Sequence, residues 1–280
     1  MGPKNSLILF IKGFILGVAN IIPGVSGGTL AVSLGLYEKI LDAIGTFFKN
    51  FKKNMGLLIP IAIGIGVALI TTSKVVSYAL TNFKAQTIFL FVGLIYGGTS
   101  LLMRKTRGKE NISNIIIFAV TFLIVIGLNF VKADSLTISF TNMGIVDYLL
   151  LALIGFIASS SMVIPGISGS FVLMIFGYYE KIINTVSNLT NFSELGSNLL
   201  ILVPFGIGVL IGIVFMAKLI TSLIKKYEVK TYFGIMGFVL SSIVVLILQI
   251  DKFTFNFGNI FTCILAFLWG YLLARAIEKE

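Results

Sequence analysis

Long apolar stretches separated by short polar segments dominate the chain. A helix needs about 20 apolar residues to cross the hydrocarbon core of a membrane. Six stretches reach or approach that length, at residues 55–80, 86–103, 112–130, 197–223, 231–249 and 259–274. Two further apolar regions, 6–41 and 147–188, are interrupted near the middle by Pro-Gly and small residues. The pattern predicts an all-α polytopic membrane protein with about six full spans and two broken elements.

Composition excludes most other classes of protein. Of the 280 residues, 57% are hydrophobic and only 11% are charged, whereas a soluble domain carries about 25% charged residues. The chain has no histidine and one cysteine, Cys263. Histidine-dependent hydrolysis, histidine-ligated metals and internal disulfides are therefore excluded. We expect no metal, no cofactor and no enzymatic activity.

The chain contains an internal repeat. Residues 13–40 align without gaps on residues 155–182, with 13 identities in 28 positions and an offset of 142 residues. The identities include Pro-Gly-x-Ser-Gly at 23–27 and 165–169, and Gly-x-Tyr-Glu-Lys at 35–39 and 177–181. Chance similarity between apolar helices would not pair such motifs. We predict a single membrane domain, 1–280, with repeat 1 at 6–130 and repeat 2 at 147–276.

Parity and charge predict how the repeats are oriented. Each repeat holds one broken element and three spans, so the second repeat should be inverted relative to the first. With the N-terminus in the cytoplasm, the inner segments carry thirteen Lys and Arg residues and the outer segments carry three. Because cytoplasmic loops are enriched in Lys and Arg, both termini are expected in the cytoplasm. Inverted repeats are typical of secondary transporters, whose substrate sites lie near the midplane.

The broken elements are predicted to be re-entrant hairpins. Pro23 and Gly24 should end one helix near Ile22, and Ser26 is a suitable N-cap for the next. The flanking half-helices are expected to be about 15 residues, or roughly 22 Å, each. That length is short of the ~30 Å hydrocarbon core, which favours re-entrance over two full crossings.

Such breaks have the chemistry of an anion site. A helix N-terminus carries partial positive charge and free N–H groups, which glycines leave uncovered. Two such termini facing each other could hold a phosphate, a carboxylate or a halide. The alternative is that the breaks are packing hinges whose serines satisfy their own backbone. The candidate substrate-binding residues are Asn20, Pro23, Gly24, Ser26, Gly27, Gly28, Thr29, Ser161, Pro165, Gly166, Ser168, Gly169 and Ser170.

Four charged residues are further candidates. Glu38 and Glu180 follow the breaks and could couple transport to protons, although each has a neighbouring lysine and could sit at the membrane interface. Lys74 and Lys218 lie within apolar stretches, where they could contact a headgroup or extend to the interface. Coupling to H⁺ or Na⁺ stays open.

The first broken element resembles a known family. Residues 12–29, KGFILGVANIIPGVSGGT, followed by Gly35-x-Tyr37-Glu38, are similar to the signature of the bacterial PopT-type polyprenyl-phosphate transporters. The resemblance covers essentially the whole chain, including the second Ile-Pro-Gly-x-Ser-Gly. It implies a bacterial cytoplasmic membrane protein with re-entrant helices that flips undecaprenyl phosphate from the outer to the cytoplasmic leaflet. One departure is Ser170-Phe171 in the second copy, where the first has Gly28-Thr29.

A lipid monophosphate suits such a site, since its tail can stay in the bilayer while its headgroup follows a polar path. We expect alternating access, with the phosphate held at the half-helix N-termini. The alternative function is a small-anion channel or an ion-coupled anion exchanger. A lipid phosphatase is disfavoured by the absence of histidine, and a purely structural role by the paired breaks. The net charge of +10 is explained by the inner loops, so no nucleic-acid partner is expected.

Overall fold

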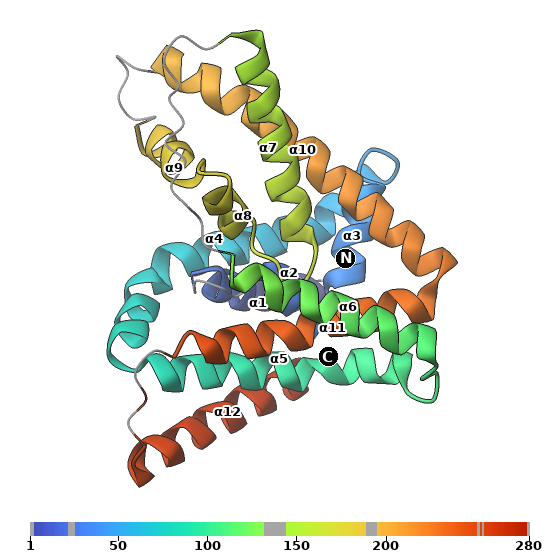
Figure 1. Ribbon diagram of the computed structural model, residues 1–280, viewed down its shortest axis with the longest axis vertical. Coiled ribbons are helices and arrows are strands. Elements are labelled where there is room, and N and C mark those ends of the chain that lie inside the picture. Colours follow the sequence, from blue (N-terminus) through green and yellow to red (C-terminus); the bar gives the residue numbers. More distant parts are fainter. Residues whose placement is uncertain are drawn as a thin grey trace.

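The computed structural model describes residues 3–21, 26–131, 144–188, 195–250, 253 and 255–278. These residues form twelve helices and no strand (Figure 1). The first six helices are α1 (Pro3–Asn20), α2 (Gly27–Ser33), α3 (Tyr37–Gly45), α4 (Phe51–Asn82), α5 (Lys84–Thr106) and α6 (Ile112–Asn129). The other six are α7 (Ile145–Val163), α8 (Gly169–Ile175), α9 (Tyr179–Ser187), α10 (Leu195–Lys226), α11 (Glu228–Leu248) and α12 (Phe257–Glu278).

Among the described residues, seven helices are long and apolar enough to cross a membrane: α4, α5, α6, α7, α10, α11 and α12. The chain is therefore a multi-pass membrane protein with an all-α fold, as predicted. Six of the seven coincide with the expected spans. The seventh, α7, is the first arm of the second broken element and was expected to be a short half-helix. At 19 residues it reaches about 28 Å, so it is long enough to cross.

The two halves of the chain repeat the same order of helices. Helices α1 to α6 recur as α7 to α12, with corresponding boundaries shifted by about the 142 residues of the sequence repeat. The two breaks fall at equivalent places, since α2 begins at Gly27 and α8 at Gly169. Both starts agree with the prediction that Ser26 and Ser168 precede a new helix.

The arm after each break was predicted as one half-helix of about 15 residues, and this prediction is wrong. Instead, two short helices of 7 and 9 residues follow each break. Gly35 has φ +66° and Gly177 has φ +72°, a left-handed conformation that ends a right-handed helix. The N–H of Leu36 reaches back to the carbonyl of Ala31 at 2.8 Å, and Tyr178 bonds Leu173 in the same way at 2.9 Å.

Glycines bring helices into close contact. In the first half α1 packs along α4, where a Cβ on Gly64 would lie 2.2 Å from the carbonyl oxygen of Phe10. The equivalent pair α7 and α10 packs the same way, with Gly208 against Ala152. Such contact through small residues is typical of membrane helices. Gly66 and Gly206, which lie two residues from Gly64 and Gly208, have open space beside them instead.

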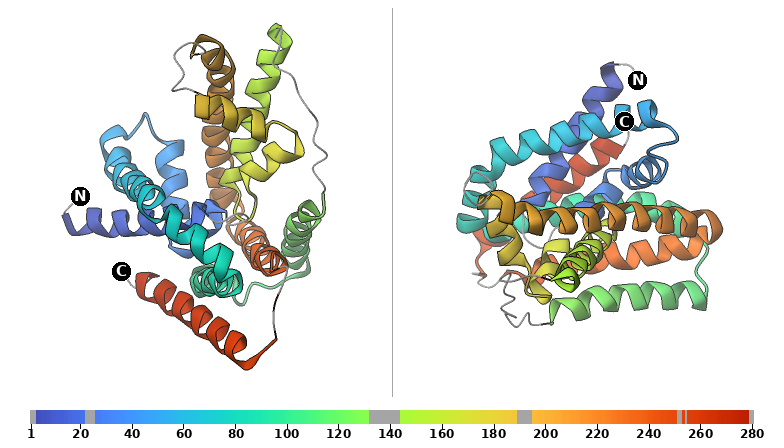
Figure 2. Two further views of the ribbon diagram at one scale, coloured as in Figure 1. Left: turned by 90° about the vertical axis from the view of Figure 1, so that its left-hand side faces the viewer. Right: turned by 90° about the horizontal axis from the view of Figure 1, so that it is seen from above.

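The last span of each half packs against the other half. Helix α6 lies along α11, and α12 lies along α5. Figure 2 shows α12 running below the rest of the molecule, away from α7–α10 of its own half. The largest buried apolar cluster includes Leu30 of α2, Ile95 of α5 and Val239 of α11, so it also joins the two halves.

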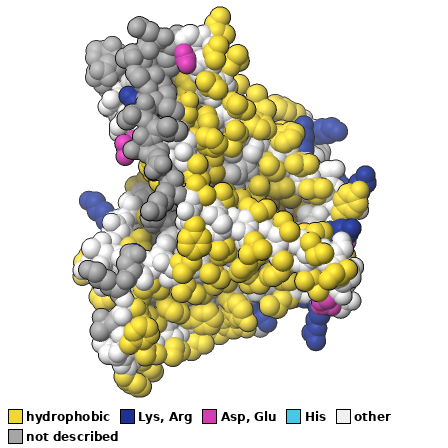
Figure 3. All heavy atoms as spheres, viewed as in Figure 1, with side chains coloured by type: hydrophobic (Ala, Val, Ile, Leu, Met, Phe, Trp, Pro, Cys, Tyr) yellow, Lys and Arg dark blue, Asp and Glu magenta, His cyan; other side chains and the backbone are white. Residues whose placement is uncertain are grey.

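Helices α5 and α11, which are equivalent in the repeat, run in opposite directions (Figure 1). Lys105 near the end of α5 forms a 2.9 Å ion pair with Glu228 at the start of α11. The segments 104–111 and 224–230 therefore lie at the same edge of the molecule. Figure 3 shows a broad apolar face with basic side chains gathered at this edge.

Candidate functional site

Residues that follow the first break contact the second break in the structure. The backbone N–H of Gly166 donates to the Thr29 hydroxyl at 2.7 Å, across 137 residues of sequence. A Cβ on Gly28 would lie 3.3 Å from the Cα of Pro165. The Tyr37 hydroxyl donates to the carbonyl of Val163 at 3.0 Å. Residues from both Pro-Gly motif regions thus form one junction.

This junction lies at half the height of the spanning helices. A Cβ on Gly166 would lie 2.4 Å from the carbonyl oxygen of Phe238, the central residue of α11 (Glu228–Leu248). Ser33 of α2 donates to the carbonyl of Ile95, near the centre of α5, at 3.3 Å. At 1.5 Å per residue, Phe238 is about 15 Å from either end of its helix.

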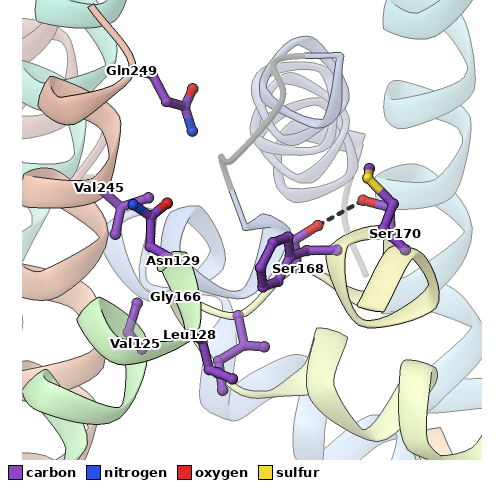
Figure 4. Close-up of a pocket in the computed structure, with 11 residues that line it drawn as sticks. Val125, Leu128, Asn129, Gly166, Ser168, Ser170, Val245 and Gln249 are labelled. Atoms are coloured by element: carbon purple, nitrogen blue, oxygen red, sulfur yellow. Dashed lines mark hydrogen bonds between the residues drawn. The ribbon is translucent and has the colours of Figure 1, made fainter. Parts of the chain in front are cut away.

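A cavity of about 210 Å³ opens beside the second break. Its polar lining comes from Ser168, Ser170, Asn129 and Gln249, and the remainder is mostly apolar. The hydroxyls of Ser168 and Ser170 are hydrogen-bonded at 2.7 Å. Figure 4 shows this pair on one side of the cavity and the amides of Asn129 and Gln249 on the other. Hydroxyl and amide groups are hydrogen-bond donors, so the cavity could bind an anion without a cationic side chain.

Asn129 and Gln249 were missed by sequence reasoning. Asn129 is the last residue of α6, and Gln249 is the C-cap of α11. In sequence they are two ordinary polar residues at the ends of apolar stretches. They come together because α6 of the first half packs along α11 of the second half. No sequence motif indicates this packing.

The first break is organised differently from the second. Ser26 precedes α2 in extended conformation but makes no capping bond through its side chain. Its hydroxyl is buried and has no hydrogen-bond partner among the described residues. Ser26 does not line the cavity that contains Ser168. The Asn20 Oδ1 lies 2.8 Å from the position of a Cβ on Gly27. Pro23 and Gly24 lie outside the described residues.

Other candidates have local or remote positions. Ser161 donates to the carbonyl of Ala158 in its own helix at 2.6 Å. This agrees with the alternative that serines at the breaks bond their own backbone. Gly169 faces Met162, whose Cγ would be 2.3 Å from an added Cβ. Glu180, Lys74 and Lys218 are exposed and line neither this cavity nor the groove described below. The structure does not bring these three to the junction of the breaks.

Glu38 takes part in a polar cluster between α3, α5 and α11. It accepts a hydrogen bond from the Tyr232 hydroxyl. Lys105 lies 5.2 Å from the centre of the Tyr232 ring and also pairs with Glu228. A small cavity of about 130 Å³ adjoins Glu38, Lys105 and Tyr232. Glu180 occupies the matching position in the second repeat, but it forms no such cluster among the described residues. The two glutamates therefore have different surroundings.

Lys12, a lysine within the first broken element, is buried. Its Nζ donates to the carbonyl of Leu34 at 3.2 Å, and Leu34 is the C-cap of α2. A cation there interacts favourably with the negative end of the helix dipole. Lys12 therefore helps to fix the short helix after the first break.

Comparisons with known proteins agree with the signature. A family model described as undecaprenyl phosphate translocase-like matches residues 16–257. The chain is 32% identical over 279 residues to a polyprenyl-phosphate transporter of Staphylococcus aureus, covering 97% of this chain and 96% of the relative. It is 26% identical over 253 residues to a polyprenyl-phosphate transporter of Vibrio cholerae, covering 85% and 77%. No solved structure matches the chain.

Proposed function

This chain belongs to the undecaprenyl phosphate translocase-like family, and on that premise we propose that it moves undecaprenyl phosphate from the outer to the cytoplasmic leaflet of a bacterial cytoplasmic membrane. One observation carries the proposal beyond the family. Gly28 and Thr29, which follow the first break, contact the second break at half the height of the spanning helices, next to a cavity lined by hydroxyls and amides. A phosphate crossing the bilayer needs hydrogen-bond donors at this depth, because an unsolvated charge in hydrocarbon is costly.

Alternating access is the mechanism that we propose. The headgroup enters the cavity beside Ser168 and Ser170, and the prenyl tail stays in the lipid. In this mechanism the hydrogen bond between Thr29 and Gly166 helps to close the path from this cavity to the opposite side of the junction. A rearrangement that breaks this bond would open the way for the phosphate, whose oxygens would then take up the freed Thr29 hydroxyl and Gly166 N–H. Gly27, Gly28 and Gly166 pack against Asn20, Pro165 and Phe238 in this structure. Once the rearrangement separates them, the lack of side chains would leave their backbone N–H groups uncovered for an anion.

The orientation is part of the same proposal. The opposite directions of α5 and α11 support an inverted repeat. Their shared basic edge supports a cytoplasmic position for segments 104–111 and 224–230, and hence for both termini. The cavity of Ser168 lies at the other ends of α6 and α11, which would face the outer leaflet. In this orientation the cavity is where the phosphate arrives.

The test is binding of purified protein in nanodiscs to undecaprenyl phosphate, with neutral polyprenol, inorganic phosphate and chloride as controls. We expect selective binding of the lipid phosphate. Ser168→Ala with Ser170→Ala should weaken it by about tenfold or more, since each lost hydrogen bond to a charged group is worth about 1.5–3 kcal/mol. The double variant Ser26→Ala with Ser168→Ala tests both breaks together.

Thr71→Val is the matched control, because it removes a hydroxyl from an exposed face of α4. Binding of chloride or free phosphate with indifference to the lipid would overturn the proposal in favour of a small-anion channel or exchanger. Unchanged lipid binding in both double variants would show that the phosphate does not bind at the breaks.

A further inference from the structure

A groove reaches the second break from the side opposite the hydroxyl-lined cavity. Its volume is about 630 Å³, and it is walled by α10, α11 and α6. Gly166 lines the first cavity, whereas the two preceding residues, Ile164 and Pro165, line the groove. The break therefore lies between two spaces that face opposite ends of the molecule.

The walls of the groove are two helical stripes that diverge from one turn. Helix α10 contributes residues 216, 219, 220 and 223, and α11 with its N-cap contributes residues 227, 230, 231, 234, 235 and 238. This spacing places each set on one face of its helix. The helices separate from their connection at Tyr227, as Figure 1 shows. Most of the lining is aliphatic or aromatic. A long hydrocarbon chain could lie along such a surface.

The end of the groove at the turn is polar and basic. Lys230, Thr231 and the tyrosine Tyr227 line it there. Lys230 is exposed, and it has no acidic partner within the described part of the chain. Phe238, near the break, is eight residues further along α11, which is about 12 Å. The groove is thus amphipathic, with a cation at the helix ends and apolar walls toward the middle.

We propose that this groove is a second site for the polyprenyl phosphate, which rests on the proposed function: the phosphate binds Lys230, and the isoprenoid chain lies between α10 and α11. The polarity matches a lipid whose headgroup lies at the membrane surface and whose tail points to the midplane. The charge favours this occupant over a zwitterionic phospholipid, because a phosphomonoester carries more negative charge than a phosphodiester and no cationic group. The lipid would leave for the cytoplasmic leaflet from here.

Photo-crosslinking locates the chain directly. A photoreactive residue at Leu223, which lines the groove, should crosslink to radiolabelled undecaprenyl phosphate in nanodiscs. The same residue at Leu210, exposed on α10 but outside the groove, is the control. We expect strong labelling at 223 that excess unlabelled lipid phosphate removes and excess phosphatidylethanolamine does not. Equal labelling at 223 and 210, or competition by the phospholipid, would overturn the proposal.

Two substitutions test the walls and the basic end. Gly234→Leu narrows the groove and should displace part of the isoprenoid chain from it. Binding of the C55 phosphate should weaken by about tenfold, which corresponds to two methylene groups of the lipid losing their buried contacts. Binding of a ten-carbon prenyl phosphate should change little. Gly66→Leu, on α4 with open space beside it, is the control. Lys230→Gln should reduce labelling at 223 severalfold, whereas Lys52→Gln should not.

The outcomes separate this proposal from the one on which it rests. If the unaltered protein binds no polyprenyl phosphate, the proposed function fails. If it binds the lipid but neither Gly234→Leu nor Lys230→Gln alters binding or crosslinking, the function stands and the groove is not a site for the lipid.

Discussion

Thr29 is the residue through which the two breaks are joined. It is fully buried, and its hydroxyl accepts the Gly166 N–H at 2.7 Å. Gly166 is half-buried, but its N–H points at the buried Thr29, and a donor turned inward without a partner is destabilising. The second repeat has Phe171 at the equivalent position. Phenylalanine has no hydroxyl, so it cannot accept the matching bond from the first repeat. The departure seen in the sequence therefore has a structural consequence: the first repeat supplies the acceptor and the second the donor.

Thr29→Val should destabilise the protein by about 1–3 kcal/mol, because it leaves the Gly166 N–H unsatisfied while preserving the shape of the side chain. Thr29→Ser keeps the hydroxyl and should retain most of the stability. The measurement is thermal unfolding in detergent. Thr99→Val is the matched control, since Thr99 is equally buried but bonds only the carbonyl of Tyr96 in its own helix. Equal losses for Thr29→Val and Thr29→Ser would contradict the role of the bond.

At the scale of single helices, the glycines decide how closely spans approach. A Cβ on Gly270 of α12 would lie 1.9 Å from the carbonyl oxygen of Leu90 in α5. The obstacle is backbone, so it cannot move aside as a flexible side chain would. The side of α12 that carries Gly270 is therefore matched in shape to α5.

Gly270→Ala should push α12 away from α5 and destabilise the protein by about 1–3 kcal/mol, as overpacking does. Gly66→Ala has open space beside it and should stabilise α4 by about 0.5–1 kcal/mol through helix propensity. Thermal unfolding of the two variants should move in opposite directions. A shift of the same sign and size in both would mean that the contact between α5 and α12 contributes nothing.

The starts and ends of elements were predictable to different degrees. Pro23-Gly24 and Ser26 predicted the start of α2, since proline and an N-cap residue act locally. The split after α2 was missed, although Gly35 was recognised as a repeated residue. Apolar residues continue on both sides of Gly35, and hydrophobic periodicity alone does not reveal a left-handed residue.

At the scale of the whole molecule, the charged edge predicts the orientation in the membrane. Single cysteines at Arg107 and Lys226, in a Cys263→Ala background, should react with an impermeant reagent only after the cytoplasmic side is exposed. A cysteine at Asn256 should react from outside in intact cells. Labelling of Arg107→Cys from outside would reverse the topology, and with it the direction in which the two cavities face.

The class of fold, the spans and the family were predictable because they depend on composition, run length and one motif. The lining of the candidate cavity was predictable in part. Ser168 and Ser170 were singled out from the repeat, and both line the cavity. Asn129, Gln249 and the groove at Lys230 depend on how distant helices pack. The register of α6 against α11 depends on contacts such as Gly237 against Phe118, and a single sequence does not specify which surfaces pair.

Because α6 and α12 each pack against the other half of the molecule, the order of synthesis affects how the protein assembles. Helix α5 is inserted long before α12, yet α12 supplies its covering surface. Until α12 has emerged from the ribosome, the side of α5 that carries Gly93 and Gly97 must face lipid or an insertion factor. The packing of the first half is therefore incomplete along α5 until α12 enters the bilayer.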